Sequence, residues 1–167
     1  MSALERLRGI LGEGPYRVVP TRDAATPCLE VERAELRELA RRLRDECGFE
    51  SNTFVTAIDR LPARPRFEVD YQLLSISAGD RVRVRVLLDE DDAWVPSIAD
   101  LWPGAAFSER ECFDMFGVRF EGHPKLERLL MPAGYEHHPL RKDFPHHGIE
   151  PDRLYREWER GRARGAS

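Results

Sequence analysis

The stretch FEVDYQLLSISAGDRVRVRV, residues 67–86, has the clearest β-strand pattern in the chain. Apolar and polar side chains alternate on both sides of a central loop, which is the period of a strand with one buried face. The apolar positions are Phe67, Val69, Tyr71 and Leu73 before the loop and Val82, Val84 and Val86 after it. The polar face pairs acids with arginines, and Asp70 lies diagonal to Arg85 in the register that we predict. We expect water to solvate this face, although it also offers a surface for an acidic partner.

Two strands with one apolar face each must pair so that these faces coincide. A four-residue loop, Ser77–Asp80, meets this condition by placing Leu73 opposite Val84 and Tyr71 opposite Val86. The sequence therefore predicts an antiparallel hairpin at the centre of the fold.

The segments around this hairpin alternate between helical and strand patterns. We predict helices at 2–11, 33–47 and 105–116, the last ending at Gly117, and strands at 16–19, 27–31 and 52–59. The tryptophans and prolines of 94–103 are expected to cover an edge of the core. The fold class is thus α+β, a small two-layer domain with a mixed or antiparallel sheet packed by helices and followed by an extended C-terminal arm.

The predicted arm contains a proline every six to eight residues from Pro124 to Pro151, which favours extended backbone over helix. All five histidines fall between His123 and His147. Large apolar side chains are also frequent, so we expect the arm to bury them, preferably on another chain. We divide the chain into a core domain, 1–117, and an arm, 118–167, with a short terminal helix beginning at Asp152.

Composition excludes several classes of protein. The formal net charge of −4 gives no basic field for nucleic acid. No apolar run reaches the roughly 18 to 20 residues that span a bilayer, and the N-terminus is too charged for a signal peptide. The three cysteines, Cys28, Cys47 and Cys112, lack metal-ligand spacing and are expected to be buried thiols. No metal, flavin or nicotinamide site is visible.

Charged motifs gather in the last helix and the arm. The helix contains Glu109-Arg110-Glu111, Asp114 and Phe116-Gly117, the arm begins with Gly122-His123-Pro124 and Leu126, and it continues to His138-Pro139-Leu140-Arg141-Lys142-Asp143-Phe144-Pro145. In order and approximate spacing these motifs resemble the signature of the C subunit of bacterial NADH-quinone oxidoreductase, the 30 kDa subunit family of respiratory complex I. The chain departs from the family pattern at Lys125, Glu127 and His137.

The resemblance implies a peripheral-arm subunit of a proton-translocating NADH:quinone oxidoreductase, without catalytic, cofactor-binding or metal-binding residues of its own. It implies contact with the D subunit of that complex, which shapes the quinone site, and with adjacent cluster-bearing subunits. NADH, FMN, iron–sulfur clusters and quinone would belong to other chains. The location implied is the cytoplasmic face of the bacterial plasma membrane, with membrane contact only through the complex.

Two alternatives remain open. One is the equivalent subunit of a membrane-bound NiFe hydrogenase or a related ferredoxin- or coenzyme-driven complex. The other is a stand-alone acid/base enzyme using Glu109, Glu111 and His123.

The candidate partner interface consists of Glu109, Arg110, Glu111, Asp114, His123, His138, Arg141, Lys142 and Asp143. Glu109 and Glu111 lie among aromatic residues, so they are candidates for buried acids unless they turn out to water. Arg110 and Asp114 have the spacing of a surface ion pair.

We expect the segment 141–143 to project outward and clasp a partner subunit. The alternative is that Arg141 pairs with Asp114 or Asp143 within the same chain.

Overall fold

The computed structural model describes residues 3–23, 25–146 and 148. The α-helices are α1 (Ala3–Leu11), α2 (Leu36–Asp45) and α3 (Ala105–Phe116), and a 3-10 helix, η1, spans Glu90–Asp92. The strands are β1 (Tyr16–Val19), β2 (Cys28–Val31), β3 (Ser51–Asp59), β4 (Phe67–Ser75), β5 (Asp80–Leu88), β6 (Trp94–Pro96) and β7 (Arg119–Glu121).

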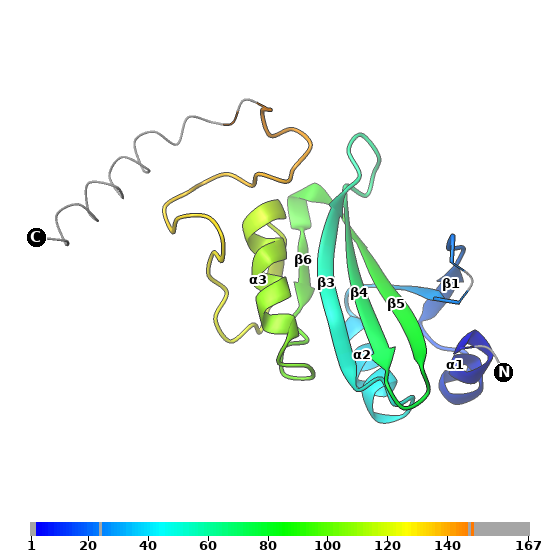
Figure 1. The fold of residues 1–167 in the computed structure, drawn as a ribbon. Coiled ribbons are helices and arrows are strands. Elements are labelled where there is room, and N and C mark those ends of the chain that lie inside the picture. The colour runs from blue at the N-terminus through cyan, green and yellow to red at the C-terminus, as the bar shows by residue number, and fades with distance from the viewer. Residues whose placement is uncertain (1–2, 24, 147, 149–167) are drawn as a thin grey trace, which may run out of the picture.

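A five-stranded sheet in the order β1-β2-β5-β4-β3 forms the centre of the molecule (Figure 1). The sheet is mixed, because β2 and β5 are parallel and the other neighbours are antiparallel. Buried residues of all three α-helices share one core cluster with the apolar face of the sheet. The α+β prediction with a mixed or antiparallel sheet is therefore confirmed.

The β4–β5 hairpin forms with the predicted faces but not with the predicted register. Tyr71 lies opposite Val84 and Leu73 opposite Val82, a shift of two residues, and Asp70 lies directly opposite Arg85. A shift of two keeps every side chain on its face, so the apolar pattern alone does not distinguish the two registers. The strands pair as far as Ser75 and Asp80, so the connecting loop is 76–79, one residue earlier than predicted.

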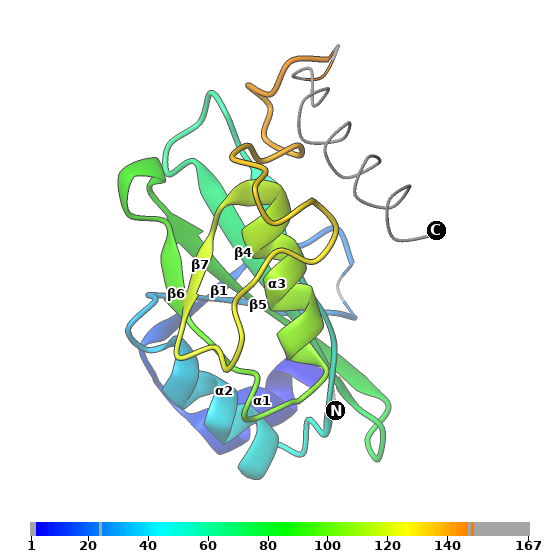
Figure 2. The same ribbon diagram turned by 90° about the vertical axis from the view of Figure 1, so that its left-hand side faces the viewer.

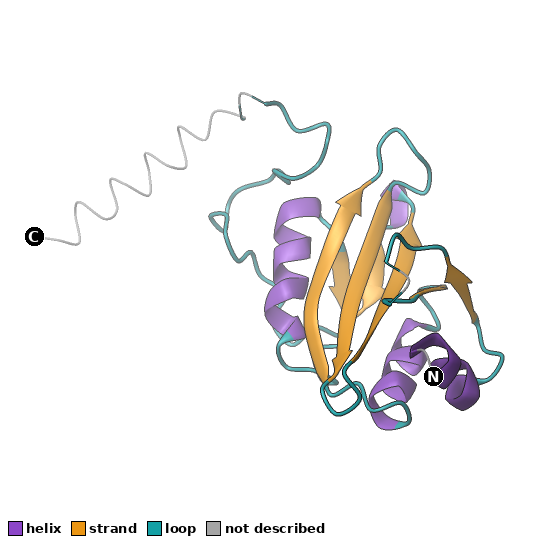
Figure 3. Cartoon of the chain, turned by 45° about the vertical axis from the view of Figure 1, so that its right-hand side comes forward, coloured by secondary structure: helices purple, strands orange, loops and turns teal. Residues whose placement is uncertain are grey.

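The prediction that water solvates the polar face of the sheet is wrong for its two acids. Glu68 and Asp70 are only 8% and 3% exposed, although no α-helix among the described residues covers this face (Figure 3). Arginine side chains cover the two acids instead: Arg85 and Arg60 approach Glu68 within 3.7 and 3.6 Å, and Arg83 approaches Asp70 within 3.6 Å. Long arginine stems can cover buried surface while their charged ends remain near water.

The remaining predicted elements form close to their expected positions. The β1–β2 hairpin and β3 agree within one residue, α2 begins three residues later than predicted, and α3 has the predicted bounds. The expectation for the Trp–Pro connector is confirmed, because Trp102 is buried and its indole N–H donates to the Phe49 carbonyl at 3.2 Å. The small parallel sheet formed by β6 and β7 was not predicted.

The arm returns along α3 instead of leaving the domain (Figure 2). The last carbonyl groups of a helix lack partners within the helix. Here Gly117 N–H donates to Phe113 O at 2.9 Å, and three arm residues satisfy the next carbonyls. The donors are His138 Nδ1 to Asp114 O at 3.0 Å, Leu140 N–H to Met115 O at 3.1 Å, and Arg141 Nε to Phe116 O at 2.6 Å.

The preference for burying the arm on another chain is wrong for three of its large apolar residues. Val118, Phe120 and Tyr135 are buried within this chain. Leu130 and Leu140 remain 63% and 53% exposed. The predicted terminal helix beginning at Asp152 lies outside the described residues, and the division of the chain at residue 117 stays a prediction.

Gly117 is the position at which helix and arm require glycine. Its φ is +77°, and a Cβ there would lie 2.5 Å from Arg141 Nη2 and 2.6 Å from His138 Nε2. We predict that Gly117→Ala lowers the free energy of unfolding by roughly 1–3 kcal/mol, because the left-handed backbone is strained for alanine and the arm must move. Urea denaturation of the isolated chain measures this change.

The matched control is Gly9→Ala in α1, where a Cβ would meet nothing within 4 Å. This change should be neutral or stabilising by up to about 1 kcal/mol, because alanine favours helix. Equal stability of the Gly117→Ala protein and the wild type would contradict the account.

Candidate functional site

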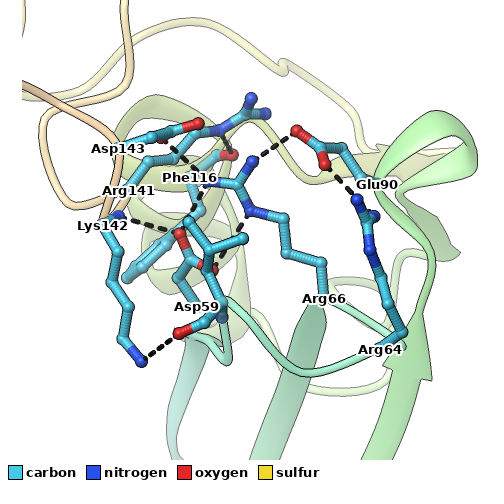
Figure 4. Close-up of polar contacts among 9 residues, drawn as sticks. Asp59, Arg64, Arg66, Glu90, Phe116, Arg141, Lys142 and Asp143 are labelled. Carbon is cyan, nitrogen blue, oxygen red and sulfur yellow. Dashed lines mark hydrogen bonds and ion pairs between the residues drawn. The ribbon is translucent and has the colours of Figure 1, made fainter.

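A buried arginine immediately before β4 joins the arm to the sheet. Arg66 is 2% exposed, and its guanidinium donates to Asp59 at the end of β3 through Nε–Oδ1 at 3.1 Å and Nη2–Oδ2 at 2.8 Å (Figure 4). This two-bond geometry matches the planar fork of arginine to a carboxylate. The pair therefore fixes the ends of two neighbouring strands relative to each other.

Two further carboxylates reach Arg66 from other parts of the chain. Asp143 of the arm pairs with Nη2 at 2.8 Å, and Glu90 of η1 pairs with Nη1. Asp59 also accepts the backbone N–H of Lys142 at 2.8 Å. We call Asp59, Arg66, Glu90 and Asp143 the Arg66 cluster.

The charge state of the cluster follows from these contacts. Burial alone raises the pKa of Asp59, but hydrogen bonds from Arg66 and from the backbone N–H groups of Leu61 and Lys142 lower it to about 2. The hydrogen bond with Arg66 also lowers the pKa of Asp143. Both acids are therefore ionised at neutral pH.

The prediction that the side chains of 141–143 project outward is wrong for Lys142 and Asp143, whose charged groups contact this chain. Asp143 pairs with Arg66, and Lys142 Nζ donates to Leu61 O at 2.8 Å. Arg141 donates through Nε to Phe116 O at 2.6 Å and lies 5.1 Å from the centre of the Phe67 ring. The alternative pairing of Arg141 with Asp114 or Asp143 is not observed either.

Asp114 is the second anchor of the arm. Its side chain is fully buried, and Oδ2 accepts the backbone N–H groups of residues 129, 130 and 131 at 3.0, 2.7 and 2.8 Å. Oδ1 pairs with Arg128 at 2.6 Å. Burial opposes ionisation, but these hydrogen bonds lower the pKa of Asp114 below its usual value. The predicted surface pair with Arg110 is therefore wrong, and Arg110 donates to the carbonyls of Glu127 and Arg128.

The sequence predicted Glu109 and Glu111 as candidate buried acids. Glu109 is buried, whereas Glu111 is exposed to water. Glu109 accepts the Ser97 hydroxyl at 2.5 Å and the Ile98 N–H at 2.8 Å. Burial raises the pKa of Glu109 to about 7 despite these hydrogen bonds. The carboxyl group therefore titrates near neutral pH inside the domain.

His123 lies beside Glu109, with Nε2 4.0 Å from a carboxylate oxygen. Its Nδ1 accepts the Lys125 N–H at 2.9 Å, so in the neutral ring the proton is on Nε2, which donates to Ala106 O at 3.0 Å. The side chains of Glu109 and His123 are 0% and 1% exposed, so a substrate has no access to them.

The described residues contain no group of three or more His, Cys, Asp or Glu side chains placed to hold a metal ion. Within the same part of the chain, no helix has the length and apolar character needed to cross a membrane. Cys28, Cys47 and Cys112 are buried free thiols.

The sequence-predicted site residues thus separate into groups. One group lies at the C-terminal end of α3 and consists of Asp114, His138, Arg141, Lys142 and Asp143. A second group is the buried pair of Glu109 and His123. Arg110 stands apart from both and holds the arm at residues 127–128. Sequence reasoning missed Asp59, Arg66 and Glu90. A signal existed for Asp59, because it continues the buried alternation of Val55 and Ala57 and an acid in that phase needs a partner.

The buried carboxyl of Glu109 gives a prediction about pH. Its pKa is about 7 in the folded chain and near 4.5 when exposed, so the folded state retains a proton that the unfolded state loses. This contribution to stability is complete below about pH 4.5 and is lost as pH rises to about 7, with a size on the order of 2–3 kcal/mol. Glu109→Gln should remove this contribution, as measured by urea denaturation from pH 4.5 to 8, and leave the slope that Asp70 adds below about pH 6, because burial raises the pKa of Asp70 to about 6.

Glu38→Gln serves as the control. Glu38 is exposed, and its hydrogen bond with Arg41 lowers its pKa, so this change should add no slope between pH 5 and 7. If wild-type and Glu109→Gln curves stay parallel across the range, Glu109 is already ionised in the folded protein.

Comparisons with known proteins agree with the arrangement of the domain. Residues 29–150 match the family model described as "Respiratory-chain NADH dehydrogenase, 30 Kd subunit". The NADH-quinone oxidoreductase C subunit of Roseiflexus sp. (strain RS-1) is 43% identical over 86% of this chain and 83% of the relative. The C subunits of the same enzyme from Hyphomonas neptunium and Saccharopolyspora erythraea are 46% and 42% identical. The alignments cover 75% and 86% of this chain but only 64% and 58% of these two relatives.

Two solved structures have a similar fold. A trypsin-resistant fragment of Nqo5 has a TM-score of 0.63 and 33% identity over 74% of this chain and 96% of the fragment. A chain of the membrane-bound sulfane sulfur reductase, an archaeal respiratory membrane complex, has a TM-score of 0.69 and 27% identity over 86% of this chain and 83% of that chain. The family match covers most of the chain and includes the segment 109–145, which contains the motifs that resemble this family. The protein therefore belongs to the family of the 30 kDa subunit of respiratory-chain NADH dehydrogenase, as do the bacterial NADH-quinone oxidoreductase C subunits.

Proposed function

We propose that this chain is a scaffolding subunit of the peripheral arm of a proton-translocating NADH:quinone oxidoreductase, and that it docks through its arm onto the D subunit. The observation that supports this proposal best has two parts. The rest of the chain holds the backbone of the arm in place, and large apolar side chains of the arm are exposed. Asp114 and the last carbonyls of α3 hold the backbone. Leu130 and Leu140 are exposed on it.

Such a surface favours association for two physical reasons. Burying one leucine side chain contributes roughly 1.5–3 kcal/mol, so two of them supply a useful share of a docking energy. A segment that is already ordered loses little conformational entropy on binding. The intrachain contacts of the arm therefore support the docking role instead of opposing it.

The same proposal assigns the redox groups to other chains. NADH, FMN, iron–sulfur clusters and quinone would be bound elsewhere in the complex, and membrane contact would arise through the assembly at its cytoplasmic face. The buried thiols and the inaccessible Glu109–His123 pair are consistent with a subunit that has no catalytic site of its own.

A second candidate is the equivalent subunit of a related membrane-bound complex, such as a hydrogenase or a ferredoxin- or coenzyme-driven reductase. The likeness to a chain of an archaeal sulfane sulfur reductase, with a TM-score of 0.69 over 86% of this chain, favours it. The similarity to subunits named NADH-quinone oxidoreductase favours the first candidate.

The test uses the tagged full chain purified from solubilised membranes. We predict that the wild type brings down partners carrying flavin and iron–sulfur clusters, and that Leu130→Asp with Leu140→Asp reduces their recovery tenfold or more, corresponding to about 1.4 kcal/mol or more. The melting temperature of the isolated variant should stay near that of wild type, because both side chains are exposed.

Ile76→Asp is the matched control, because Ile76 is 70% exposed in the β4–β5 loop, far from the arm in the fold. It should leave partner recovery unchanged. Wild-type recovery of nickel-containing or sulfur-reducing partners would favour the second candidate, and recovery of no partner would reject both.

A further inference from the structure

Arg141 differs from its neighbours because the terminal nitrogens of its side chain have no hydrogen-bond partner in the part of the chain that the structure describes. Lys142 and Asp143 use their charged ends within the chain, on Leu61 O and Arg66. Arg141 uses only Nε, in its hydrogen bond to Phe116 O. Figure 4 shows its two terminal nitrogens pointing away from the guanidinium of Arg66, and no acid among the described residues pairs with them.

This guanidinium is in an unfavourable position for an unpaired charge. Burial and the nearby Arg66 both lower the pKa of Arg141, although Asp143, Glu90 and Asp59 offset part of the effect from a distance. Arg66 and Arg141 lie 5.1 Å from the centre of the same Phe67 ring, and the cluster carboxylates are engaged by Arg66. A half-buried charge gains more from an ion pair than an exposed one does.

Arg141 is one of the residues that line a small pocket in the arm. Its lining consists of Glu136, His137, His138, Arg141, Asp143, Phe144 and Pro145. His138 adds no positive charge at neutral pH, because burial lowers its pKa. Arg141 is the one arginine or lysine in the lining, and its hydrogen bond to Phe116 O aligns it in advance. Of the two acids in the lining, Asp143 is paired with Arg66, and Glu136 is exposed.

We infer that the terminal nitrogens of Arg141 receive a single carboxylate side chain from the subunit that docks on the arm. A planar guanidinium with two free parallel donors matches a carboxylate. A phosphate group would call for more than one cation, but Lys142 is held on Leu61 O and Arg128 is paired with Asp114. The exposed Leu140 next to Arg141 provides the apolar surface around such a contact. This inference rests on the proposed docking function and names the chemistry of one contact within it.

The chain allows a direct chemical test, because Lys125 and Lys142 are its only lysines. In a protein carrying Lys125→Arg, Lys142→Arg and Arg141→Lys, the only side-chain amine is at position 141. A water-soluble carbodiimide activates carboxylates, and an amine in contact with one forms an amide while the activating group leaves as a urea. The control carries only Lys125→Arg and Lys142→Arg.

Both proteins are purified with their partners from membranes, treated with carbodiimide and mapped by mass spectrometry. The inference predicts an amide between position 141 and an Asp or Glu of a partner chain, and no such product in the control. Partner recovery without that amide, or an amide only to an acid of the same chain, would overturn the inference while the docking function stands. If the wild-type chain recovers no partner, the docking function itself fails.

A second measurement uses the wild-type chain, so it tests the inference even if the Arg141→Lys protein does not assemble. Phenylglyoxal should modify Arg141 in the isolated wild-type chain but not in the assembled complex. The exposed Arg8 of α1, at the far end of the molecule, serves as the reference for reagent access. Modification of Arg141 to the same extent in both states would overturn the inference.

Discussion

The buried guanidinium of Arg66 is the interaction on which the arrangement of the chain depends. It connects the end of β3, the start of β4, η1 and the arm through Asp59, Glu90 and Asp143. Removing one member of a buried ion pair typically costs about 3–5 kcal/mol, because the remaining charge is left without a partner. The arm is thus tied to a buried charge of the domain, and Asp114 fastens its earlier half to α3 through three backbone N–H groups.

This construction explains how a segment without regular secondary structure can serve as a docking surface. Its prolines exclude helix, so its backbone groups need partners outside itself. Part of that need is met by the last turn of α3, whose carbonyls also lack partners, and each element completes the other. The arm then keeps Leu130, Leu140 and the terminal nitrogens of Arg141 available in a fixed arrangement.

Local signals in the sequence were sufficient for the three α-helices and for β1 to β5, but not for the small β6–β7 sheet or for the path of the arm. The bounds of α3 followed from the Gly117 cap, and the faces of the hairpin followed from alternation, whereas its register did not, because a shift of two residues preserves the pattern. The family resemblance identified the segment 138–145 as important. Its contacts with Asp59 and Arg66 depend on chain closure over some 80 residues, for which no local pattern exists. Asp59 in a core-facing position was the available hint.

Backbone hydrogen exchange of the isolated chain tests most directly whether the Arg66 cluster holds the arm in place. The N–H groups of Leu140 and Lys142 donate to Met115 O and Asp59 Oδ2, and those of residues 129–131 donate to Asp114. We predict that all of them are protected in the wild type. In Arg66→Met, Leu140 and Lys142 should lose protection tenfold or more, about 1.4 kcal/mol, relative to residues 129–131. Exchange of Leu140 and Lys142 at the rate of an unstructured peptide in the wild type, or unchanged protection in Arg66→Met, would contradict this role of the cluster.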